Sequence, residues 1–368
     1  MIPAGTLFAA LLKKKGLSGF CSEKECEMSI FVKDSPDYFR GIFNLESREE
    51  GLTANRLSPE LKELYQADGE HRFIRANCPS GVRLAFETDS PFVKMGLKYG
   101  RSARAVYAVD VIVDGQNLQR WIPPHPEEGK EYEFQMELST RGGVHQILIH
   151  LPHLTENTLK CLELKEGAFV KPCTSAAPSA GGSKGAGHRF LFLGDSITQG
   201  MTVSGASLAY PAALSEAFGA DFINLSVGGE IMRGELGRYA LAYDWDCVFV
   251  AYGINDFNNC IPPERTGEEA FQMLRTLCGA GRGEGEVIVI TPIPCTRGGL
   301  ENESGFSLES YREAIASAAR EFPGTFLIDG KTLLEARAEY FIDGLHPNDA
   351  GMKIYSERLI RTLRRIGF

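Results

Sequence analysis

The sequence predicts two domains in one chain: a β-sandwich, followed by an α/β domain built around a five-stranded parallel sheet. The length of 368 residues is too great for one typical hydrophobic core. The pattern also changes along the chain, because short alternating segments fill the first half, whereas apolar runs and helical periodicity take turns in the second half. A stretch of small residues from Cys173 to Gly187 separates the two patterns, as expected for a linker.

These changes in pattern set the predicted boundaries. We expect an N-terminal extension over residues 1–30, a β-sandwich over residues 31–172, a linker over residues 173–187 and the α/β domain over residues 188–368. The sandwich and the α/β domain are each long enough to bury a core of their own.

Segments with a two-residue repeat predict the strands of the sandwich. Tyr107, Val109, Val111 and Val113 recur at every second position, and Asp114-Gly115 after them is typical of a hairpin turn. Further strand candidates are Arg83 to Phe86, Phe92 to Tyr99, Glu131 to Leu138, Val144 to Leu151 and Leu159 to Leu164. Many short strands with frequent turn residues favour two packed antiparallel sheets, as in a jelly roll.

Five apolar runs predict the strands of the α/β domain. They are Phe190 to Leu193, Phe222 to Leu225, Cys247 to Ala251, Val287 to Pro292 and Thr325 to Ile328. Helical periodicity lies between and after them, at Glu268 to Leu277, Leu308 to Ala319 and Met352 to Leu363. Alternation of strands and helices predicts parallel strands with helices on both faces of the sheet. In the first half, Ser58 before Pro59 predicts one short helix that reaches Tyr65.

Charge and cysteine usage narrow the class of protein. A formal net charge of −9 argues against a nucleic-acid partner, because phosphate binding needs clustered Lys and Arg. No apolar run is long enough to cross a membrane. The nine cysteines are odd in number and lack a CxxC pair, which predicts reduced thiols and neither a disulfide framework nor a zinc site. With no signal-peptide pattern at the start, we expect a cytoplasmic protein, the alternative being a secreted one whose signal peptide is removed.

Four polar segments in the α/β domain carry the residue types that acyl transfer needs. They are Gly194-Asp195-Ser196, Asn224 to Gly229, Gly253-Ile254-Asn255-Asp256 and Asp343 to Pro347. The first three follow predicted strands, so parallel pairing brings them to one edge of the sheet. We expect Ser196 as nucleophile and His346 as the base that takes its proton, while Asp343 orients the ring.

The negative oxygen of a tetrahedral intermediate needs fixed hydrogen-bond donors. The candidates are the Ser196 backbone N–H, an N–H of Gly228 or Gly229, and the Asn255 side-chain amide. Glycine suits this position because no Cβ holds the substrate away from the backbone.

The four segments, in this order, resemble the conserved blocks of the SGNH hydrolases, also called the GDSL esterase/lipase family. The resemblance covers residues 189–368 and implies a three-layer α/β/α domain of flavodoxin-like topology. It also implies a catalytic triad of Ser196, Asp343 and His346. The family's glycine usually falls five residues after the asparagine of its block, which here favours Gly229, with Asn255, for the oxyanion hole. The first block reads GDSIT in place of GDSL, a common variation.

A sandwich followed by this kind of domain also resembles two-domain bacterial carbohydrate esterases. Asp114 to Leu118 is similar to a turn found in their sandwich domains. Trp121 could stack on a sugar or pack within the core. The resemblance implies an acetylated sugar as substrate.

Four further residues are expected around the site without reacting themselves. Asp195 and Asp256 are expected to bond loop backbone behind the nucleophile and behind Asn255. Tyr252 could line the acyl pocket or anchor its loop, and Gly228 is the alternative oxyanion donor. His150 and His153 are not expected to share a metal, because strand geometry would point them to opposite faces.

The expected activity is hydrolysis of a small acyl ester, most simply acetyl on a carbohydrate or oligosaccharide, through an acyl-serine. Neither a cofactor nor a metal is expected, because the triad and the oxyanion donors supply the chemistry. The alternatives are an acyl-thioesterase or lysophospholipase using the same residues, and an inactive carbohydrate-binding protein.

Overall fold

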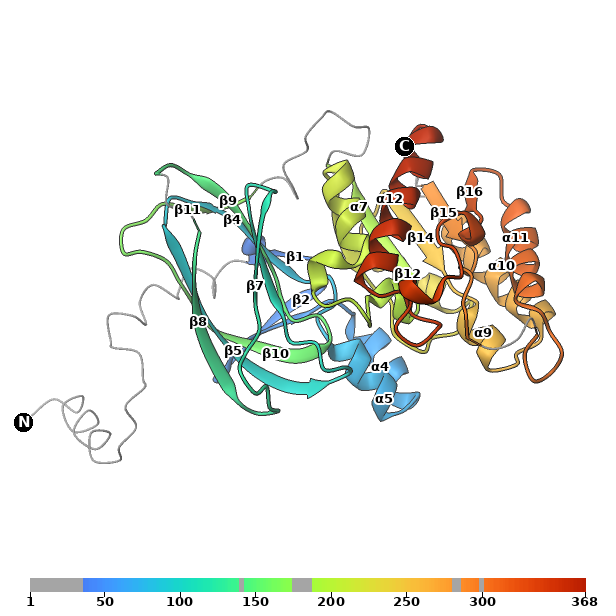
Figure 1. Cartoon of the computed structure of the whole chain (residues 1–368), viewed down its shortest axis with the longest axis horizontal. Helices are drawn as coiled ribbons and strands as arrows, with labels where there is room; N and C mark the ends of the chain where they lie inside the picture. The colour runs from blue at the N-terminus through green and yellow to red at the C-terminus, as the bar shows by residue number, and fades with distance from the viewer. Residues whose placement is uncertain (1–35, 139–141, 174–186, 280–285, 298–300) are drawn as a thin grey trace, which may run out of the picture.

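The structure, a computed structural model, describes residues 36–138, 142–173, 187–279, 286–297 and 301–368. A pair of antiparallel sheets and a layered α/β part lie side by side (Figure 1). The predicted N-terminal extension lies outside the described residues, as does the predicted linker except for its two end residues. None of the helices in the described ranges combines the length and apolar character that crossing a bilayer requires.

Two antiparallel sheets form the first part of the molecule. Their strands are β1 (Phe39–Arg40), β2 (Asn44–Arg48), β3 (Gly51–Asn55), β4 (Arg83–Thr88), β5 (Phe92–Ser102), β6 (Val109–Val113), β7 (Asn117–Trp121), β8 (Glu131–Glu137), β9 (His145–His150), β10 (Thr155–Glu163) and β11 (Val170–Pro172). One sheet has the order β1-β4-β9-β6-β7 with β11 paired to β4, and the other has the order β2-β3-β10-β5-β8. Buried residues of both sheets, such as Phe86, Leu97 and Ile149, form one core, so the predicted sandwich is confirmed.

The predicted turn at Asp114-Gly115 joins β6 to β7. Asp114 has φ 52° and Gly115 has φ 68°, the left-handed geometry that tight hairpins favour. Trp121 at the end of β7 stacks on Phe134 with ring centroids 4.1 Å apart, so its ring packs within the sandwich.

The second part contains a five-stranded parallel sheet. Its strands are β12 (Arg189–Gly194), β13 (Asp221–Asn224), β14 (Cys247–Ala251), β15 (Glu286–Ile290) and β16 (Thr325–Ile328). Their order, β13-β12-β14-β15-β16, is the order of flavodoxin-like folds, as predicted.

Helices cover both faces of this sheet. They are α6 (Ser196–Gln199), α7 (Tyr210–Phe218), α8 (Leu236–Ala240), α9 (Ile254–Asn258), α10 (Pro263–Gly279), α11 (Leu308–Arg320) and α12 (Asp349–Arg365), with 3-10 turns at Ala206–Leu208, Gly330–Thr332 and Ala338–Tyr340. A further 3-10 turn, Pro36–Tyr38, precedes β1 in the sandwich. Successive strand residues point to opposite faces, so Phe190 and Phe192 join the core under α7 and α12. Leu191 and Leu193 join the core under α8, α10 and α11.

Two helices from the first half of the chain pack on the α/β part. They are α4 (Pro59–Ala67), capped by Ser58 as predicted, and α5 (Glu70–Asn77). Leu61 and Tyr65 are buried in the same core as Leu191 and Leu193, and Figure 1 shows both helices beside the α/β layers. Residues 59–77 therefore belong by packing to the α/β core, although β strands of the sandwich precede and follow them.

Asp110 is the centre of a polar contact between the two parts. It is fully buried, accepts hydrogen bonds from Arg120 at 2.6 and 3.1 Å, and accepts two more from the backbone N–H and hydroxyl of Ser207 at 3.0 and 2.6 Å. Arg120 also donates to Ser204, whose hydroxyl donates to Asp349 at the start of α12. The sandwich is thus hydrogen-bonded to the loop after the first α/β strand.

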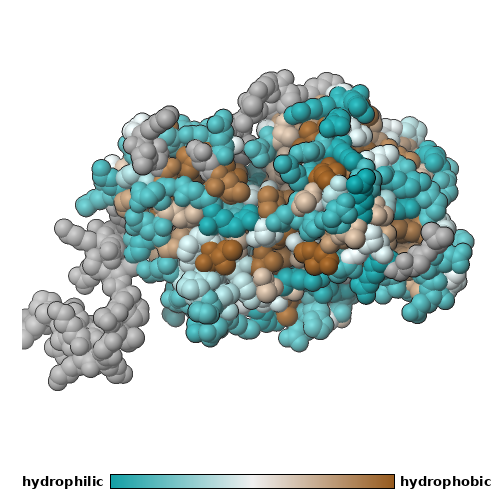
Figure 2. All heavy atoms as spheres, viewed as in Figure 1, coloured by the Kyte–Doolittle hydropathy of each residue, from teal (hydrophilic) through white to brown (hydrophobic). Residues whose placement is uncertain are grey.

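The surface in view is largely hydrophilic, with small separate hydrophobic patches (Figure 2). The large apolar side chains that are exposed come from different elements, among them Phe43, Leu118, Val144 and Ile342. Isolated exposed apolar residues of this kind are normal for a globular protein.

Candidate active site

Ser196 lies at the carboxyl end of β12, where the chain turns sharply into α6. Asp195 caps this helix, because its side chain accepts a hydrogen bond from the Ile197 backbone N–H at 2.9 Å. Gly194 is required before it, since a Cβ there would lie 2.2 Å from the Thr198 hydroxyl oxygen. The turn presents the Ser196 side chain, which is 5% exposed, at the edge of the sheet.

His346 reaches Ser196 from a loop just before α12. Its Nε2 lies 2.8 Å from the Ser196 Oγ, and its Nδ1 lies 2.8 Å from the Asp343 Oδ2. The other carboxylate oxygen of Asp343 accepts from the backbone N–H groups of Leu345 and His346 at 3.1 and 2.9 Å. The turn needs Gly344, which has φ 79°. A serine, a histidine and an aspartate thus form one hydrogen-bonded chain.

The pKa values of Asp343 and His346 suit a neutral imidazole base that is held by a carboxylate anion. Burial acts to raise the pKa of Asp343, but hydrogen bonds from the backbone and ring of His346 outweigh it and hold the pKa at about 2. Burial lowers the pKa of His346 below its usual value, against the opposing effect of Asp343. At neutral pH the imidazole is therefore uncharged and can accept the Ser196 proton.

The two glycines after β13 differ in what their N–H groups contact. The Gly228 N–H donates to the Gln199 side-chain oxygen at 2.7 Å. The Gly229 N–H has no hydrogen-bond partner among the described residues, and neither has the backbone N–H of Ser196. Gly229 has φ 81°, a conformation that glycine adopts without strain. Gly229 therefore retains a donor that Gly228 has already used.

Asn255 lies in α9, directly after β14. Its amide nitrogen donates to the Glu230 carbonyl oxygen at 2.9 Å, which fixes the side chain and leaves the second amide proton available. Because Glu230 directly follows Gly229, this hydrogen bond connects the Asn255 side chain to the segment that carries the Gly229 N–H.

Asp195 and Asp256 are buried carboxylates that accept hydrogen bonds from the loops next to the candidate site. Asp256 accepts from the Met232 backbone N–H and from the Thr266 hydroxyl, both at 3.0 Å, and so links the loop after Gly229 to α10. Burial raises the pKa of Asp195 to about 7 and that of Asp256 to about 6. Tyr252 lies in the core that contains Leu193, with 2% of its surface exposed, which fits an anchor of the loop better than a wall of the acyl pocket.

Arg75 and Gln199 also contact the glycine turn, and sequence reasoning had not assigned them a role. Arg75, in α5, donates from Nη1 to the Gly228 carbonyl oxygen at 2.7 Å. The Gln199 amide nitrogen donates to the Arg75 carbonyl oxygen at 2.9 Å and to the Ser80 hydroxyl at 3.1 Å. No motif could indicate Arg75, because it approaches from a segment more than 100 residues before Gly228.

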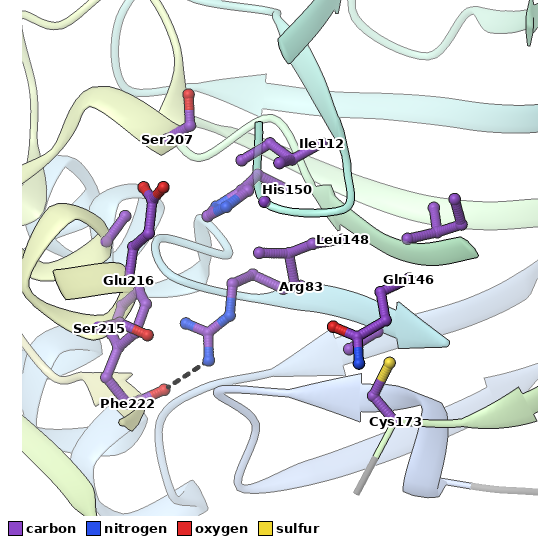
Figure 3. Close-up of a pocket in the computed structure, with 14 residues that line it drawn as sticks. Arg83, Ile112, Gln146, Leu148, His150, Cys173, Ser207, Ser215, Glu216 and Phe222 are labelled. Atoms are coloured by element: carbon purple, nitrogen blue, oxygen red, sulfur yellow. Dashed lines mark hydrogen bonds between the residues drawn. The ribbon is translucent and has the colours of Figure 1, made fainter. Parts of the chain in front are cut away.

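A cavity lies between the sandwich and α7, with an empty volume of about 590 Å³ that includes space open to solvent (Figure 3). Arg83 and His150 line it from the sandwich, while Glu216 and Phe222 line it from the α/β part. The Nδ1 of His150 is buried and has no hydrogen-bond partner among the described residues. None of the residues lining this cavity belongs to the four polar segments, so it is separate from the candidate active site.

The comparisons with known proteins concern both halves of the molecule. Residues 192–354 match the GDSL-like Lipase/Acylhydrolase family. No curated protein sequence matches the chain.

Several solved structures share the two-part architecture. A salicylyl-acyltransferase, SsfX3, from a tetracycline biosynthetic pathway has 20% identity and a TM-score of 0.76, covering 89% of this chain and 94% of its own. A family two carbohydrate esterase from Clostridium thermocellum, solved with cellohexaose, has 14% identity and a TM-score of 0.58, covering 78% and 93%. An acetyl xylan esterase from the rumen bacterium Butyrivibrio proteoclasticus has 14% identity and a TM-score of 0.54, covering 78% and 90%. At these identities the likeness is one of fold.

Proposed function

We propose that this protein is a serine esterase acting through Ser196, His346 and Asp343, because residues 192–354 match the GDSL-like lipase/acylhydrolase family, whose members are also called SGNH hydrolases. The observation that carries the proposal is the hydrogen-bonded chain from Ser196 Oγ through His346 to Asp343, with 2.8 Å at each step. A serine placed this way loses its proton to the imidazole as it attacks.

In the acylation step, the Ser196 Oγ attacks the ester carbonyl carbon and its proton moves to His346 Nε2. The imidazolium is stabilised by Asp343, which stays ionised throughout. The tetrahedral intermediate then collapses, the bond to the alcohol oxygen breaks, and His346 gives its proton to that oxygen. The alcohol leaves and the acyl group remains on Ser196.

In the deacylation step, water takes the place of the alcohol. His346 removes a proton from the attacking water and returns it to Ser196 Oγ as the acyl–serine bond breaks. In both steps the negative carbonyl oxygen is stabilised by the backbone N–H groups of Ser196 and Gly229 and by the Asn255 amide. The unused N–H of Gly229 and the fixed position of the Asn255 side chain support this assignment.

For the substrate we propose a small acyl group, acetyl in the simplest case, on a carbohydrate. The sandwich in front of the catalytic part supports this proposal, because family two carbohydrate esterases and an acetyl xylan esterase share that architecture. We also propose a cytoplasmic location, supported by the free thiols of six cysteines in the described ranges: Cys78, Cys173, Cys247, Cys260, Cys278 and Cys295.

The proposal is tested by hydrolysis of p-nitrophenyl esters of increasing chain length by the wild type and by Ser196→Ala. We expect the wild type to be active, with a rate that falls steeply beyond acetate, and the variant to be inactive with an unchanged circular dichroism spectrum. Rates that rise with chain length would instead favour a thioesterase or lysophospholipase. Equal background rates for the two proteins would favour an inactive carbohydrate-binding protein.

The similarity to the salicylyl-acyltransferase gives one further candidate, transfer of the acyl group to an alcohol. Both reactions pass through the acyl-serine and differ only in what attacks it. Adding a sugar alcohol acceptor to the p-nitrophenyl acetate assay separates them, because transfer yields an acetylated sugar in place of acetate.

A further inference from the structure

Three arginines from separate parts of the chain lie near the candidate active site: Arg75 in α5, Arg104 after β5 and Arg297 after β15. None of the three has an ion-pair partner among the residues that the structure describes. The protein as a whole carries a net charge of −9, so a group of unpaired cations at this place is not a consequence of composition.

Arg75 lies closest to the oxyanion donors. Its Nη1 donates to the Gly228 carbonyl oxygen at 2.7 Å, and the same nitrogen lies 2.8 Å from where a Cβ of Gly229 would be. This bond uses one N–H of the guanidinium, and the structure shows no hydrogen bond from its other nitrogens to a described residue.

Arg297 lies against the loop that holds the base. Its backbone N–H donates to the Gly344 carbonyl oxygen at 2.9 Å, and its Cβ is 3.1 Å from the position a Gly344 Cβ would take. Gly344 lies between Asp343 and His346 in the sequence, so the backbone of Arg297 is fixed beside the triad. The side chain of Arg297 is exposed to solvent.

Arg104 lies in the sandwich, in the segment between β5 and β6. The preceding residue, Ala103, donates its backbone N–H to the Leu154 carbonyl oxygen at 2.8 Å, which fixes the loop, and the Arg104 side chain is exposed. After burial, which is the largest effect, the charges of Arg104 and Arg297 also lower the pKa of His346. The charge of Arg104 acts on Arg75 as well, so Arg104 lies near both His346 and Arg75.

Other arginines near the site are neutralised by carboxylates. Arg72 and Arg233 contact Glu230 at 2.7 and 2.6 Å, and Arg120 contacts Asp110 at 2.6 Å. Three positive charges without such partners repel one another, and an anion between them would remove that cost.

From this arrangement we infer that the alcohol part of the ester carries an anionic group, a carboxylate or a phosphate, which Arg104 and Arg297 bind with support from Arg75. The inference rests on the proposed esterase function. His346 gives its proton to the departing alcohol oxygen, so cations beside His346 face the alcohol part and not the acyl part. Guanidinium groups bind both carboxylate and phosphate through paired hydrogen bonds.

The test compares acetate esters of phenols that carry a charged or a neutral group on the ring. They are 4-acetoxybenzoate, its neutral amide 4-acetoxybenzamide, 4-acetoxyphenyl phosphate and phenyl acetate. The amide withdraws electrons more strongly than the ionised carboxylate, so intrinsic reactivity favours the neutral ester. We expect kcat/KM to be about tenfold higher for 4-acetoxybenzoate than for the amide. The preference should shrink as NaCl is raised to about 0.5 M, because salt screens exposed charges. The phosphate ester shows which of the two anionic groups is preferred.

The variants Arg104→Gln and Arg297→Gln should each reduce the ratio of kcat/KM between the anionic and neutral esters, and the double variant should abolish the preference. The matched control is Arg361→Gln, an exposed arginine in α12 without an ion-pair partner among the described residues, which should keep the wild-type ratio.

Equal kcat/KM for 4-acetoxybenzoate and the amide in an active enzyme would overturn the inference and leave the esterase proposal standing. Faster hydrolysis of p-nitrophenyl hemisuccinate than of p-nitrophenyl butyrate, without a preference among the acetates, would overturn the assignment to the alcohol part. Loss of all hydrolysis, with the wild type no faster than Ser196→Ala, is the separate failure of the proposed function.

Discussion

Asn255 has two amide protons, and only one of them is donated to a residue that the structure describes. The amide nitrogen donates this proton in a hydrogen bond to the Glu230 carbonyl oxygen at 2.9 Å, which holds the side chain in place before a substrate arrives. A donor fixed in advance stabilises the developing charge without reorganising during the reaction.

Asn255→Ala should therefore lower kcat for p-nitrophenyl acetate by about 10²–10³, with a small effect on KM. The fold should remain, because the residue is only partly buried. Asn255→Asp is a useful companion, since it keeps the size but replaces the donor with a negative charge, and it should be at least as slow. An unchanged kcat for the alanine variant would remove Asn255 from the mechanism.

The pH dependence of the reaction should report His346. Its pKa is lowered by burial, raised by Asp343 and lowered further by Arg104 and Arg297. Only the uncharged imidazole accepts the Ser196 proton, so kcat/KM on a neutral ester should be constant above pH ~7 and fall only below pH ~6.5. Arg104→Gln removes a charge that disfavours the imidazolium, so the fall should begin at higher pH in that variant. A pH–rate profile measures both, and a wild-type inflection above neutral pH would contradict the assignment.

Among the elements, the short helix α6 and the glycine turn after β13 depend on Gln199. Its side-chain oxygen accepts from the Gly228 N–H, and its amide nitrogen donates to Arg75 and Ser80 in the segment around α5. One buried side chain thus joins three segments that surround the nucleophile.

Gln199→Met keeps the volume of this side chain but leaves the Gly228 N–H buried without an acceptor. We expect a loss of about 1–3 kcal/mol in the free energy of unfolding and a reduced kcat, because the turn that presents Gly229 is released. Gln199→Glu retains the acceptor and serves as the control for the glycine turn. Denaturant titration and p-nitrophenyl acetate kinetics give the two quantities, and a Met variant with wild-type kcat would show that the turn needs no such bond.

Much of the α/β part was predictable because parallel strands bring their carboxyl ends to one edge. The positions of Ser196, Asn255 and the glycine pair follow from this rule, since each comes after an apolar run. Strands β1 to β3, β7 and β11 were not predicted, because they are short, and β2 is a half-exposed edge strand with a polar sequence. Helix α10 begins at Pro263, before the predicted Glu268, because its first turn is polar and lacks the apolar period.

The residues around the site were harder to predict than the reacting ones. Whether Gly228 or Gly229 keeps a free N–H depends on Gln199, whose contact has no periodicity or motif in the sequence. Arg75 and Arg104 come from segments that the sequence assigns to the sandwich, so only the tertiary structure brings them to the triad.

At the scale of the whole molecule, the two parts are joined through buried polar groups. Asp110 lies in the sandwich, yet two of its hydrogen bonds come from Ser207 in the α/β part. Burial acts to raise the pKa of Asp110, but hydrogen bonds from Arg120 and Ser207 outweigh it and lower the pKa. A carboxyl group with a lowered pKa contributes stability above its unfolded pKa of about 3.9, and the contribution is lost as the pH falls through the folded pKa.

Asp110→Ala should lower the free energy of unfolding at neutral pH by about 3–5 kcal/mol, because it leaves Arg120 without its buried partner. The double variant Asp110→Ala/Arg120→Ala should lose less than the sum of the single variants, since each removes the same contact. Denaturant titration at neutral pH measures all three. Additive losses would show that the two side chains do not act together.

Helices α4 and α5 also have a consequence for synthesis on the ribosome. The apolar sides of Leu61 and Tyr65 emerge more than 100 residues before Leu191 and Leu193, the strand residues that cover them. The sandwich strands that follow must be translated while this helical pair has nothing to pack against, a state in which nascent chains attract chaperones and aggregate. Helices α4 and α5 gain their packing partners only when the parallel sheet forms, so a chain cut short before β12 would leave Leu61 and Tyr65 without the core that they share with Leu191 and Leu193.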